Sequence, residues 1–153
     1  MDERTFRDAM GKFATGVTVI TTLARDKVHG MTANAMMSVS LNPKLILVSI
    51  DEKAHMLEKI NQSGRFAISI LSEQQKDISM HFAGQFKRDE VVDFDWFHGL
   101  PVIKDCLANI VCRVYQSHPA GDHTLFLGEV EDILIRDGTP LTFYEGKYRK
   151  ISG

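Results

Sequence analysis

The sequence is poor in cysteine and has no long apolar segment. Its two cysteines, Cys106 and Cys112, would lie about 20 Å apart on one extended strand, which is too far for a disulfide. No apolar run approaches the roughly 18 residues that a membrane-spanning helix needs. The start, MDERTFRDAMGKF, is acidic and amphipathic, whereas a signal peptide is first cationic and then apolar. We therefore expect a cytoplasmic protein that does not enter a membrane.

The chain also lacks an excess of basic charge. Lysine and arginine number 18 against 20 acidic residues, a formal net charge of −2 at pH 7. No basic cluster is longer than a pair such as Lys87-Arg88, whereas nucleic-acid-binding proteins usually show a basic stripe. The apolar fraction of 44% is ordinary for a globular protein. We therefore expect a single domain over residues 1–153 that does not bind nucleic acid.

Several catalytic motifs are absent as well. No Gly-x-Gly-x-x-Gly occurs, so any nicotinamide nucleotide is not held by a Rossmann unit. The segment GKFATGVT has the glycine spacing of a phosphate loop, but it lacks the lysine and leads into a strand. The histidines and cysteines show no zinc-ligand spacing, which predicts that no metal is bound. No Gly-x-Ser-x-Gly elbow indicates a serine nucleophile.

The apolar pattern predicts a mainly β chain with short helices. Residues 3–13 carry apolar side chains at helical spacing and should form a helix with one buried face. Residues 54–63 have helical spacing too, and Ser72 and Gln75 form a capping box for a helix that ends near Phe82. Strands are expected at residues 16–24, 44–50, 65–71, 108–114 and 123–138, with a turn at 25–30 and a closing segment at 140–151.

Two segments depart from simple periodicity. The apolar parity slips between Val130 and Ile133, which predicts a β-bulge near Glu131-Asp132. Residues 84–101 mix charge with aromatics, which favours a surface loop with a few buried aromatic side chains, or alternatively a mobile lid or partner contact. Six or seven strands with few tight hairpin signals indicate a closed antiparallel barrel with peripheral helices.

The segment HGMTANAMMSVSLNP is the most unusual part of the chain, because it is uncharged from Gly30 to Pro43 and rich in small polar residues. With the motifs above absent, a reaction that a cofactor carries itself remains. A flavin ring is flat and neutral, and one edge carries amide-like donors and acceptors. The small residues of Thr32–Ala35 would let the backbone approach such an edge.

Simpler interpretations of the same segment remain open. Thr32 and Asn34 could hydrogen-bond a flavin, but they could equally be a polar pair at a strand end that the backbone satisfies. Met36 and Met37 offer soft, polarizable contacts, yet core packing is the more common role of such a pair.

Six blocks of the sequence, in this order, resemble the flavin reductase family, which has a flavin-binding split-barrel fold. They are FRDAMGKFATGVTVITT, HGMTANAMMSVSLNPKLILVSI, FAISILSEQQKDISMHFAG, GLPVI, AGDHTLFLGEV and PLTFYEGKY. The resemblance covers about residues 5 to 150. It is strongest to the small reductase components of two-component hydroxylases that act on phenol or 4-hydroxyphenylacetate.

The resemblance implies a mainly β, antiparallel split barrel of Greek-key type with short peripheral helices, assembled as a homodimer. It implies that NADH is oxidised and FAD or FMN reduced, and that the reduced flavin diffuses to a separate large flavin-dependent monooxygenase. The cofactor itself carries the hydride transfer, so no catalytic side chain is expected. NADPH is the alternative donor, but no arginine pair flanks Gly121–His123 to bind its 2′-phosphate.

The resemblance also assigns binding residues. The flavin ring would be lined by Met31, Thr32, Ala33 and Asn34, with Ser38 nearby, and the ribityl and phosphate region would be held by Ser49 and Ile50. Phe82 is a weaker flavin contact, with a core role as its alternative. Gly121, Asp122 and His123 would lie at the nicotinamide, and Tyr148 would neighbour the dinucleotide or simply close the barrel.

One position departs from the family pattern. Many members carry Ser-x-Thr shortly after the strand that ends in Val-Ser, whereas this chain has Lys53-Ala54-His55. A flavin phosphate would then be bound by Lys53 and the N-terminus of the following helix. The choice between FAD and FMN stays open, with FAD favoured.

Two functions from other classes also fit parts of the sequence. One is a non-catalytic flavin-binding electron carrier on the same barrel, which would hold flavin without consuming NADH. The other is a small barrel that binds oligonucleotides or oligosaccharides. The lack of a basic stripe argues against the second.

Overall fold

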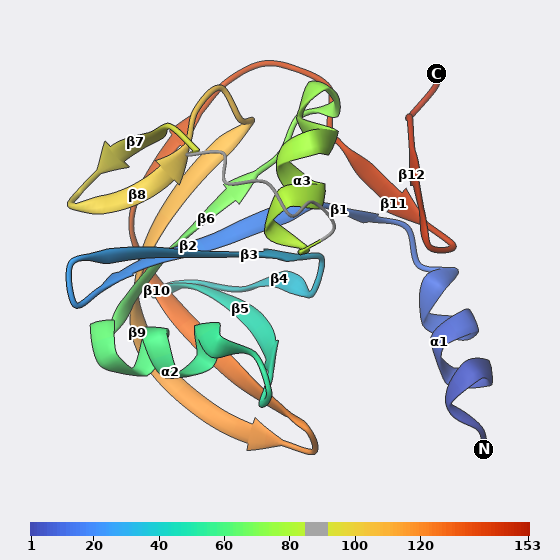
Figure 1. Ribbon diagram of the computed structural model, residues 1–153, viewed down its shortest axis with the longest axis horizontal. Coiled ribbons are helices and arrows are strands. Elements are labelled where there is room, and N and C mark those ends of the chain that lie inside the picture. Colours follow the sequence, from blue (N-terminus) through green and yellow to red (C-terminus); the bar gives the residue numbers. More distant parts are fainter. Residues whose placement is uncertain (85–91) are drawn as a thin grey trace.

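A seven-stranded antiparallel sheet forms the body of the protein (Figure 1). The computed structural model describes residues 1–84 and 92–153. The strands lie in the order β3-β2-β6-β9-β10-β5-β4. Their bounds are β2 Thr18–Ala24, β3 Lys27–Ala33, β4 Met36–Leu41, β5 Lys44–Asp51, β6 Arg65–Ile70, β9 Ala108–Ala120 and β10 His123–Ile135.

Two smaller sheets and three helices surround this body. The three-stranded sheet consists of β1 (Thr15–Gly16), β11 (Thr142–Tyr144) and β12 (Lys147–Arg149), and a hairpin consists of β7 (Phe94–Phe97) and β8 (Leu100–Ile103). The helices are α1 (Glu3–Gly11), α2 (His55–Ser63) and α3 (Lys76–Phe82), and a short 3₁₀ turn, η1 (Glu73–Gln75), precedes α3.

The sheet curls into a barrel that stays open between β3 and β4. One buried core contains side chains from both ends of the strand order. Ile20 on β2 and Val48 on β5 pack there together with Phe66 and Phe126. β3 and β4 follow each other in the chain but occupy opposite ends of the strand order. The expected closed barrel is therefore wrong in this detail, and the open seam matches the split barrel that the resemblance implies.

Helix α2 and the strand connections complete the barrel. Met56 and Ile60 of α2 are buried in the same core, and α2 packs against β2, β3 and β5. β6, β9 and β10 lie side by side, and β5, which precedes them in the chain, pairs with β10. This is Greek-key connectivity, as expected.

The core leaves no room for a side chain at Gly128 on β10. A Cβ there would lie 2.7 Å from Cζ of Phe66 and 2.9 Å from Cβ of Cys112, and both residues are fully buried. We expect Gly128→Ala to lower the free energy of unfolding by about 1–3 kcal/mol, measured as a lower denaturant midpoint. Gly16→Ala is the control, because no atom lies within 4 Å of a Cβ at Gly16. Equal midpoints for both variants would contradict the packing constraint.

Most expected elements are confirmed. The capping box is present, because the Ser72 N–H donates to Gln75 Oε1 at 3.0 Å. The β9–β10 register shifts between Val130 and Asp132, which confirms the bulge, and it shifts a second time between Leu127 and Gly128. The two cysteines are free thiols, as the sequence predicts.

Three expectations about local structure are wrong. No residue of α1 is buried, so the helix exists without the buried face. The turn expected at 25–30 is confined to Arg25 and Asp26, and β3 begins at Lys27. The part of 84–101 that was expected to be a loop contains the β7–β8 hairpin, while residues 85–91 lie outside the described residues.

Candidate functional site

β3 offers an open backbone edge. It stands at one end of the strand order, so no further strand of residues 1–84 and 92–153 pairs with its outer side. Helix α3 lies beside it, and the Thr32 hydroxyl donates a hydrogen bond to the Ser79 carbonyl at 2.6 Å. The uncharged segment of the sequence therefore forms the two edge strands of the open barrel, with Asn34 and Ala35 as the link between them.

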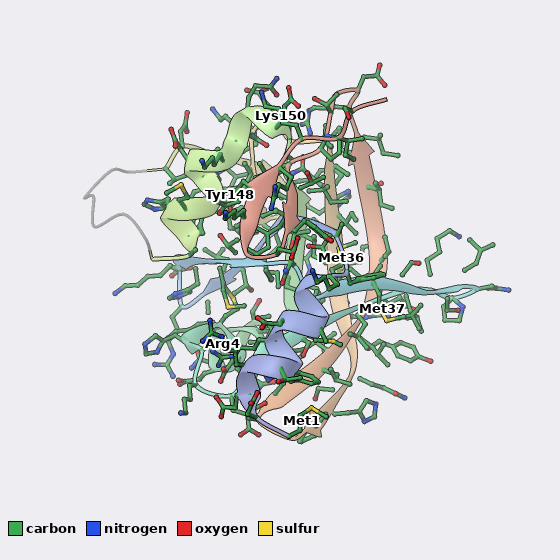
Figure 2. All side chains as sticks on the ribbon, turned by 90° about the vertical axis from the view of Figure 1, so that its right-hand side faces the viewer. Met1, Arg4, Met36, Met37, Tyr148 and Lys150 are labelled. Atoms are coloured by element: carbon green, nitrogen blue, oxygen red, sulfur yellow. The ribbon has the colours of Figure 1, made fainter. Side chains whose placement is uncertain are left out.

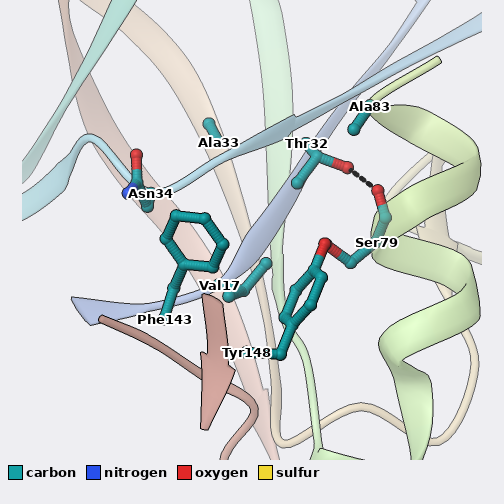
Figure 3. A pocket seen from close by; sticks show the side chains of 8 residues that line it. All are labelled: Val17, Thr32, Ala33, Asn34, Ser79, Ala83, Phe143 and Tyr148. Atoms are coloured by element: carbon teal, nitrogen blue, oxygen red, sulfur yellow. Dashed lines mark hydrogen bonds between the residues drawn. The ribbon is translucent and has the colours of Figure 1, made fainter. Parts of the chain in front are cut away.

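A pocket of about 170 Å³ lies at the end of β3 (Figure 3). It brings together three predicted flavin-ring residues and Tyr148, which comes from the far end of the chain. None of the lining side chains that belong to residues 1–84 and 92–153 is charged. They are Val17, Thr32, Ala33, Asn34, Ser79, Ala83, Phe143 and Tyr148. We call this the β3-end pocket.

Hydrogen bonds set what each polar group in the β3-end pocket can offer a ligand. The hydrogen of the Thr32 hydroxyl is committed to the Ser79 carbonyl, so towards a ligand Thr32 can only accept. Ser79 is fully buried, and its hydroxyl shares a 2.7 Å hydrogen bond with the Tyr148 hydroxyl. The exposed amide of Asn34 makes no hydrogen bond within the described chain. Asn34 is therefore free to donate and accept, whereas Thr32 is partly satisfied by backbone.

A second cavity, of about 300 Å³, adjoins the β3-end pocket and shares Asn34 and Phe143 with it. Its other wall is the apolar side of α1, including Phe6 and Met10. The hydroxyl of Thr15, which also lines this cavity, is buried and has no hydrogen-bond partner among the described residues. A polar ligand group or a water molecule would satisfy it.

Met31 and Phe82 line a different cleft, of about 490 Å³, on the other part of β3. Neighbouring residues separate the two spaces, because Met31 lines the cleft and Thr32 the β3-end pocket. The predicted ring-binding set is therefore divided between two adjoining hollows. Phe82 also packs against the buried cluster that contains Val19 and Leu71, which fits the core role considered for it, and its contact with the flavin stays a prediction.

The predicted ribityl and phosphate residues occupy the end of β5. Ser49 is half-buried, and its N–H donates to the Ala35 carbonyl at 3.1 Å. Ile50 is fully buried in the core, so only its backbone can reach a ligand, and its assignment to the ribityl and phosphate region stays a prediction. Ser38 on β4 is exposed.

The predicted nicotinamide residues lie beside Lys53, which the sequence assigns to the flavin phosphate. His123 is paired with Asp51 across β10 and β5, and the Glu52 N–H donates to the Asp122 carbonyl at 2.9 Å. The hydrogen bond from His123 at 2.8 Å holds the pKa of Asp122 below its usual value, and the charge of Lys53 adds to this.

Tyr148 does not belong to this cluster. The β9–β10 turn is at the bottom of Figure 1, whereas β12 lies at the upper right. The structure therefore separates Tyr148 from Gly121, Asp122 and His123, although the resemblance gives Tyr148 either a place beside the same dinucleotide or a role in closing the barrel. Instead it brings Tyr148 to the β3-end pocket.

Sequence reasoning missed Ser79, Val17 and Phe143 as pocket residues. Ser79 follows the capping box by one helical turn and is completely buried on α3. The helical periodicity of this segment could have predicted that Ser79 faces inward. Phe143 stands in the recognised block PLTFYEGKY, but its position next to Asn34 depends on tertiary contacts.

Two other features are absent from the described residues. These residues contain no group of three or more His, Cys, Asp or Glu side chains placed to hold a metal ion. None of the helices among them has the length and apolar character needed to span a membrane.

Comparison with known proteins agrees with this geometry. Residues 10–152 match the family model for the flavin reductase like domain. An NADH-dependent flavin reductase from Rhodococcus sp is 49% identical over 148 residues, which cover 95% of this chain and 84% of that protein. The reductase component of 4-hydroxyphenylacetate 3-monooxygenase from Thermus thermophilus is 36% identical over 147 residues, 95% of each chain.

A solved structure gives the same result. The flavin reductase PheA2 in its native state superposes with a TM-score of 0.98 at 62% sequence identity, covering 100% of both chains. The family, the split-barrel fold and the oxidoreductase class expected from the sequence are thereby confirmed. The chain belongs to the flavin reductase family.

Proposed function

We propose that this protein is an NADH-dependent reductase that supplies reduced FAD or FMN to a separate aromatic monooxygenase. The observation that carries the proposal is the uncharged β3-end pocket on an open strand edge, with the free amide of Asn34 at its mouth. When bound, a flavin supplies the hydride acceptor and NADH the donor, so the chain needs no catalytic acid or base.

The β3-end pocket suits the flavin ring in polarity. The side chain of Ala33 is small, so the ring can approach the backbone of β3. The amide of Asn34 can then donate a hydrogen bond to the polar edge of the ring. The reduced ring gains electron density, and neutral donors stabilise it without opposing charge. Charged side chains in this pocket would shift that balance, which explains why a segment without charge forms it.

We assign the remaining predicted residues to the same reaction. The backbone of Ser49 and Ile50 and the charge of Lys53 would hold the ribityl and phosphate part. Gly121–His123 would position the nicotinamide, since the hydrogen bond between His123 Nδ1 and Asp122 Oδ1 fixes the ring at 2.8 Å. Because Lys53 adjoins this turn, the site assigned to the nicotinamide and the site assigned to the flavin phosphate would be neighbours at this end of β5.

One assay tests the proposal against its rivals. Purified protein is mixed with NADH and free FAD or FMN, and the NADH absorbance is followed. A reductase consumes NADH many times faster than the background reaction. A flavin-binding electron carrier would bind flavin but leave the NADH rate at background, and an oligonucleotide-binding or oligosaccharide-binding barrel would do neither.

A partner monooxygenase is tested by transfer through solution. The reductase and the oxygenase component of a 4-hydroxyphenylacetate or phenol hydroxylase are placed on opposite sides of a membrane permeable to flavin, under limiting oxygen. Hydroxylation in the oxygenase compartment is expected if reduced flavin diffuses. Hydroxylation only when the proteins share a compartment would contradict the diffusible transfer.

The free thiols favour a reducing compartment. Cys106 and Cys112 are both buried, and burial raises the pKa of Cys112 to about 12. Disulfides are rare where glutathione and thioredoxin keep thiols reduced. We therefore propose the cytoplasm as the location.

We further propose that two copies associate through the outer face of β4, β5, β10 and β9. Leu47 and Leu127 are directly paired on this face, and the neighbouring Met37, Val39 and Leu41 are exposed, Leu41 to 79%. Figure 2 shows Met37 on the β4–β5 hairpin, which extends away from the body. An apolar sheet face of this kind is typical of an interface, and a two-fold dimer covers it with the same face of a second copy.

Leu47→Glu should convert the dimer to a monomer. The glutamate would place a charge without a partner in the proposed interface, which is strongly unfavourable. Sedimentation at micromolar concentration is expected to give a dimer for the wild type and a monomer for the variant. Ile151→Glu adds the same charge at an exposed apolar residue near the C-terminus and should remain dimeric. A wild-type monomer with full reductase activity would contradict the proposal.

A further inference from the structure

Helix α1 has an apolar side that remains largely exposed to solvent. Phe6, Met10 and Phe13 follow one another at helical spacing, and their exposed fractions are 56%, 57% and 79%. The helix stands apart from the barrel (Figure 1), and its apolar side forms one wall of the cavity of about 300 Å³ that adjoins the β3-end pocket. Large apolar side chains that gather on one exposed side are typical of an interaction surface.

Helix α1 is anchored to the body at its C-terminal end. The Gly11 carbonyl accepts a hydrogen bond from the Glu145 N–H at 3.0 Å, and the Lys12 ammonium group donates to the Glu145 carboxylate at 2.7 Å. Glu145 lies on the turn between β11 and β12. A helix of nine residues is only marginally stable by itself in water, because most helical stability in proteins comes from packing of the apolar side. The rest of α1 therefore needs a surface that covers Phe6, Met10 and Phe13.

The β4–β5 hairpin is a second apolar feature that is exposed. Its segment from Met36 to Pro43 carries no charge, and Met37, Val39 and Leu41 are all exposed, with Leu41 at 79%. Leu41 is paired with Lys44 at the end of the hairpin, which extends away from the body (Figure 2). In the dimer proposed above, this end would reach past the sheet face that the two copies share.

We propose, on the basis of that two-fold dimer, that α1 of each copy packs its apolar side against the β4–β5 hairpin of the second copy. The two-fold axis makes this contact reciprocal, so one dimer covers both helices and both hairpins. The hairpin surface is continuous with the proposed dimer face, because Met37 is paired with Leu47 and Leu47 with Leu127. Since residues 36–43 carry no charge, burying them against α1 removes no charged group of the hairpin from water.

Photocrosslinking from α1 tests this contact in the full-length protein. In the Phe13→p-benzoylphenylalanine variant, ultraviolet light joins the new ring covalently to a group that it contacts. The products are separated by mass under denaturing conditions, and the linked peptides of the covalent dimer are identified by mass spectrometry. Trp96→p-benzoylphenylalanine is the matched control, because Trp96 is an aromatic residue on β7 that is 57% exposed and belongs to neither proposed surface.

The Phe13 variant is expected to form a covalent dimer in which the α1 peptide is linked to residues 36–44 of the other copy, and the Trp96 variant is expected to remain a single chain. A second measurement uses charge. Phe13→Glu should raise the dissociation constant of the dimer about ten-fold, because it places a carboxylate in an apolar contact. Trp96→Glu should leave the dissociation constant unchanged. Phe13 is exposed to 79% in the single chain, so this substitution should not prevent folding.

Four results would overturn the inference. Crosslinks within a single chain would mean that α1 folds back on its own body. Crosslinks to another surface of the second copy would refute the hairpin as its partner. Sedimentation of the wild type with vesicles of phosphatidylcholine and phosphatidylserine, lost in Phe13→Glu, would assign the helix to a lipid surface. A wild type that sediments as a monomer would remove the dimer itself. By contrast, the expected crosslinks in a protein that does not oxidise NADH would refute the reductase function and leave the contact standing.

Discussion

The His123→Ala variant should be reduced by NADH about 100-fold more slowly than the wild type, while its affinity for flavin stays nearly unchanged. Hydride transfer requires the nicotinamide to lie close to the flavin ring in a defined orientation, and small misplacements are costly in rate. The half-buried His123 begins β10, and its ring is held by Asp122 at 2.8 Å. It is thus a fixed group that can position a donor ring.

The proximity of Lys53 sharpens this test. Because Lys53 is close enough to influence Asp122, a defect at His123 could in principle come from a disturbed flavin phosphate. Lys53→Ala should show the opposite pattern, with weaker flavin binding and a normal reduction rate once flavin is saturating. Stopped-flow reduction and flavin titration of both variants separate the two sites.

The His123→Ala experiment has a matched control at another histidine. His98→Ala removes a histidine from the β7–β8 turn and should reduce flavin at the wild-type rate. Normal reduction together with weakened flavin binding in His123→Ala would place His123 on the flavin side. The assignment of Gly121–His123 to the nicotinamide would then be wrong.

Local pattern was sufficient for elements whose stability depends on neighbours in the sequence. The capping box of Ser72 and Gln75 and the bulge near Asp132 are of this kind. The β7–β8 hairpin was missed because its two-residue turn, in which both His98 and Gly99 have positive φ, carries His where such turns usually have Asn or Asp before the glycine. The helix α1 was predicted correctly from its apolar spacing. That spacing does not determine whether another part of the chain covers the apolar side of the helix.

The same distinction applies to the site. Thr32 and Asn34 were found because their small, neutral segment is visible in the sequence. Ser79 joins them only through packing of α3 on β3, and Asp51, two residues before Lys53, meets His123 only through the antiparallel register of β5 and β10. The burial of Ile50 follows from alternation along β5, so the sequence already indicated that only the backbone of Ile50 could contact a flavin.

Asn34→Asp should weaken flavin binding and slow flavin reduction. The substitution keeps the shape of the side chain, replaces the amide donor with an acceptor, and adds a negative charge at the mouth of the β3-end pocket. Because the side chain is exposed in the free protein, folding should be little affected. Once a bound ring covers the site, a like charge near the reduced flavin costs about 1–4 kcal/mol, with the lower value applying if water still reaches the carboxylate.

Two further variants separate charge from lost hydrogen bonding in this experiment. Asn34→Ala removes the hydrogen bonds alone and should cost about 0.5–1.5 kcal/mol, less than Asn34→Asp. Asn61→Asp adds the same charge on the exposed side of α2 and should behave as the wild type. Flavin titration and stopped-flow reduction at pH 8 keep the new carboxylate ionised. Wild-type affinity and rate for Asn34→Asp under these conditions would mean that Asn34 only shapes the link between β3 and β4, and that the flavin ring lies elsewhere.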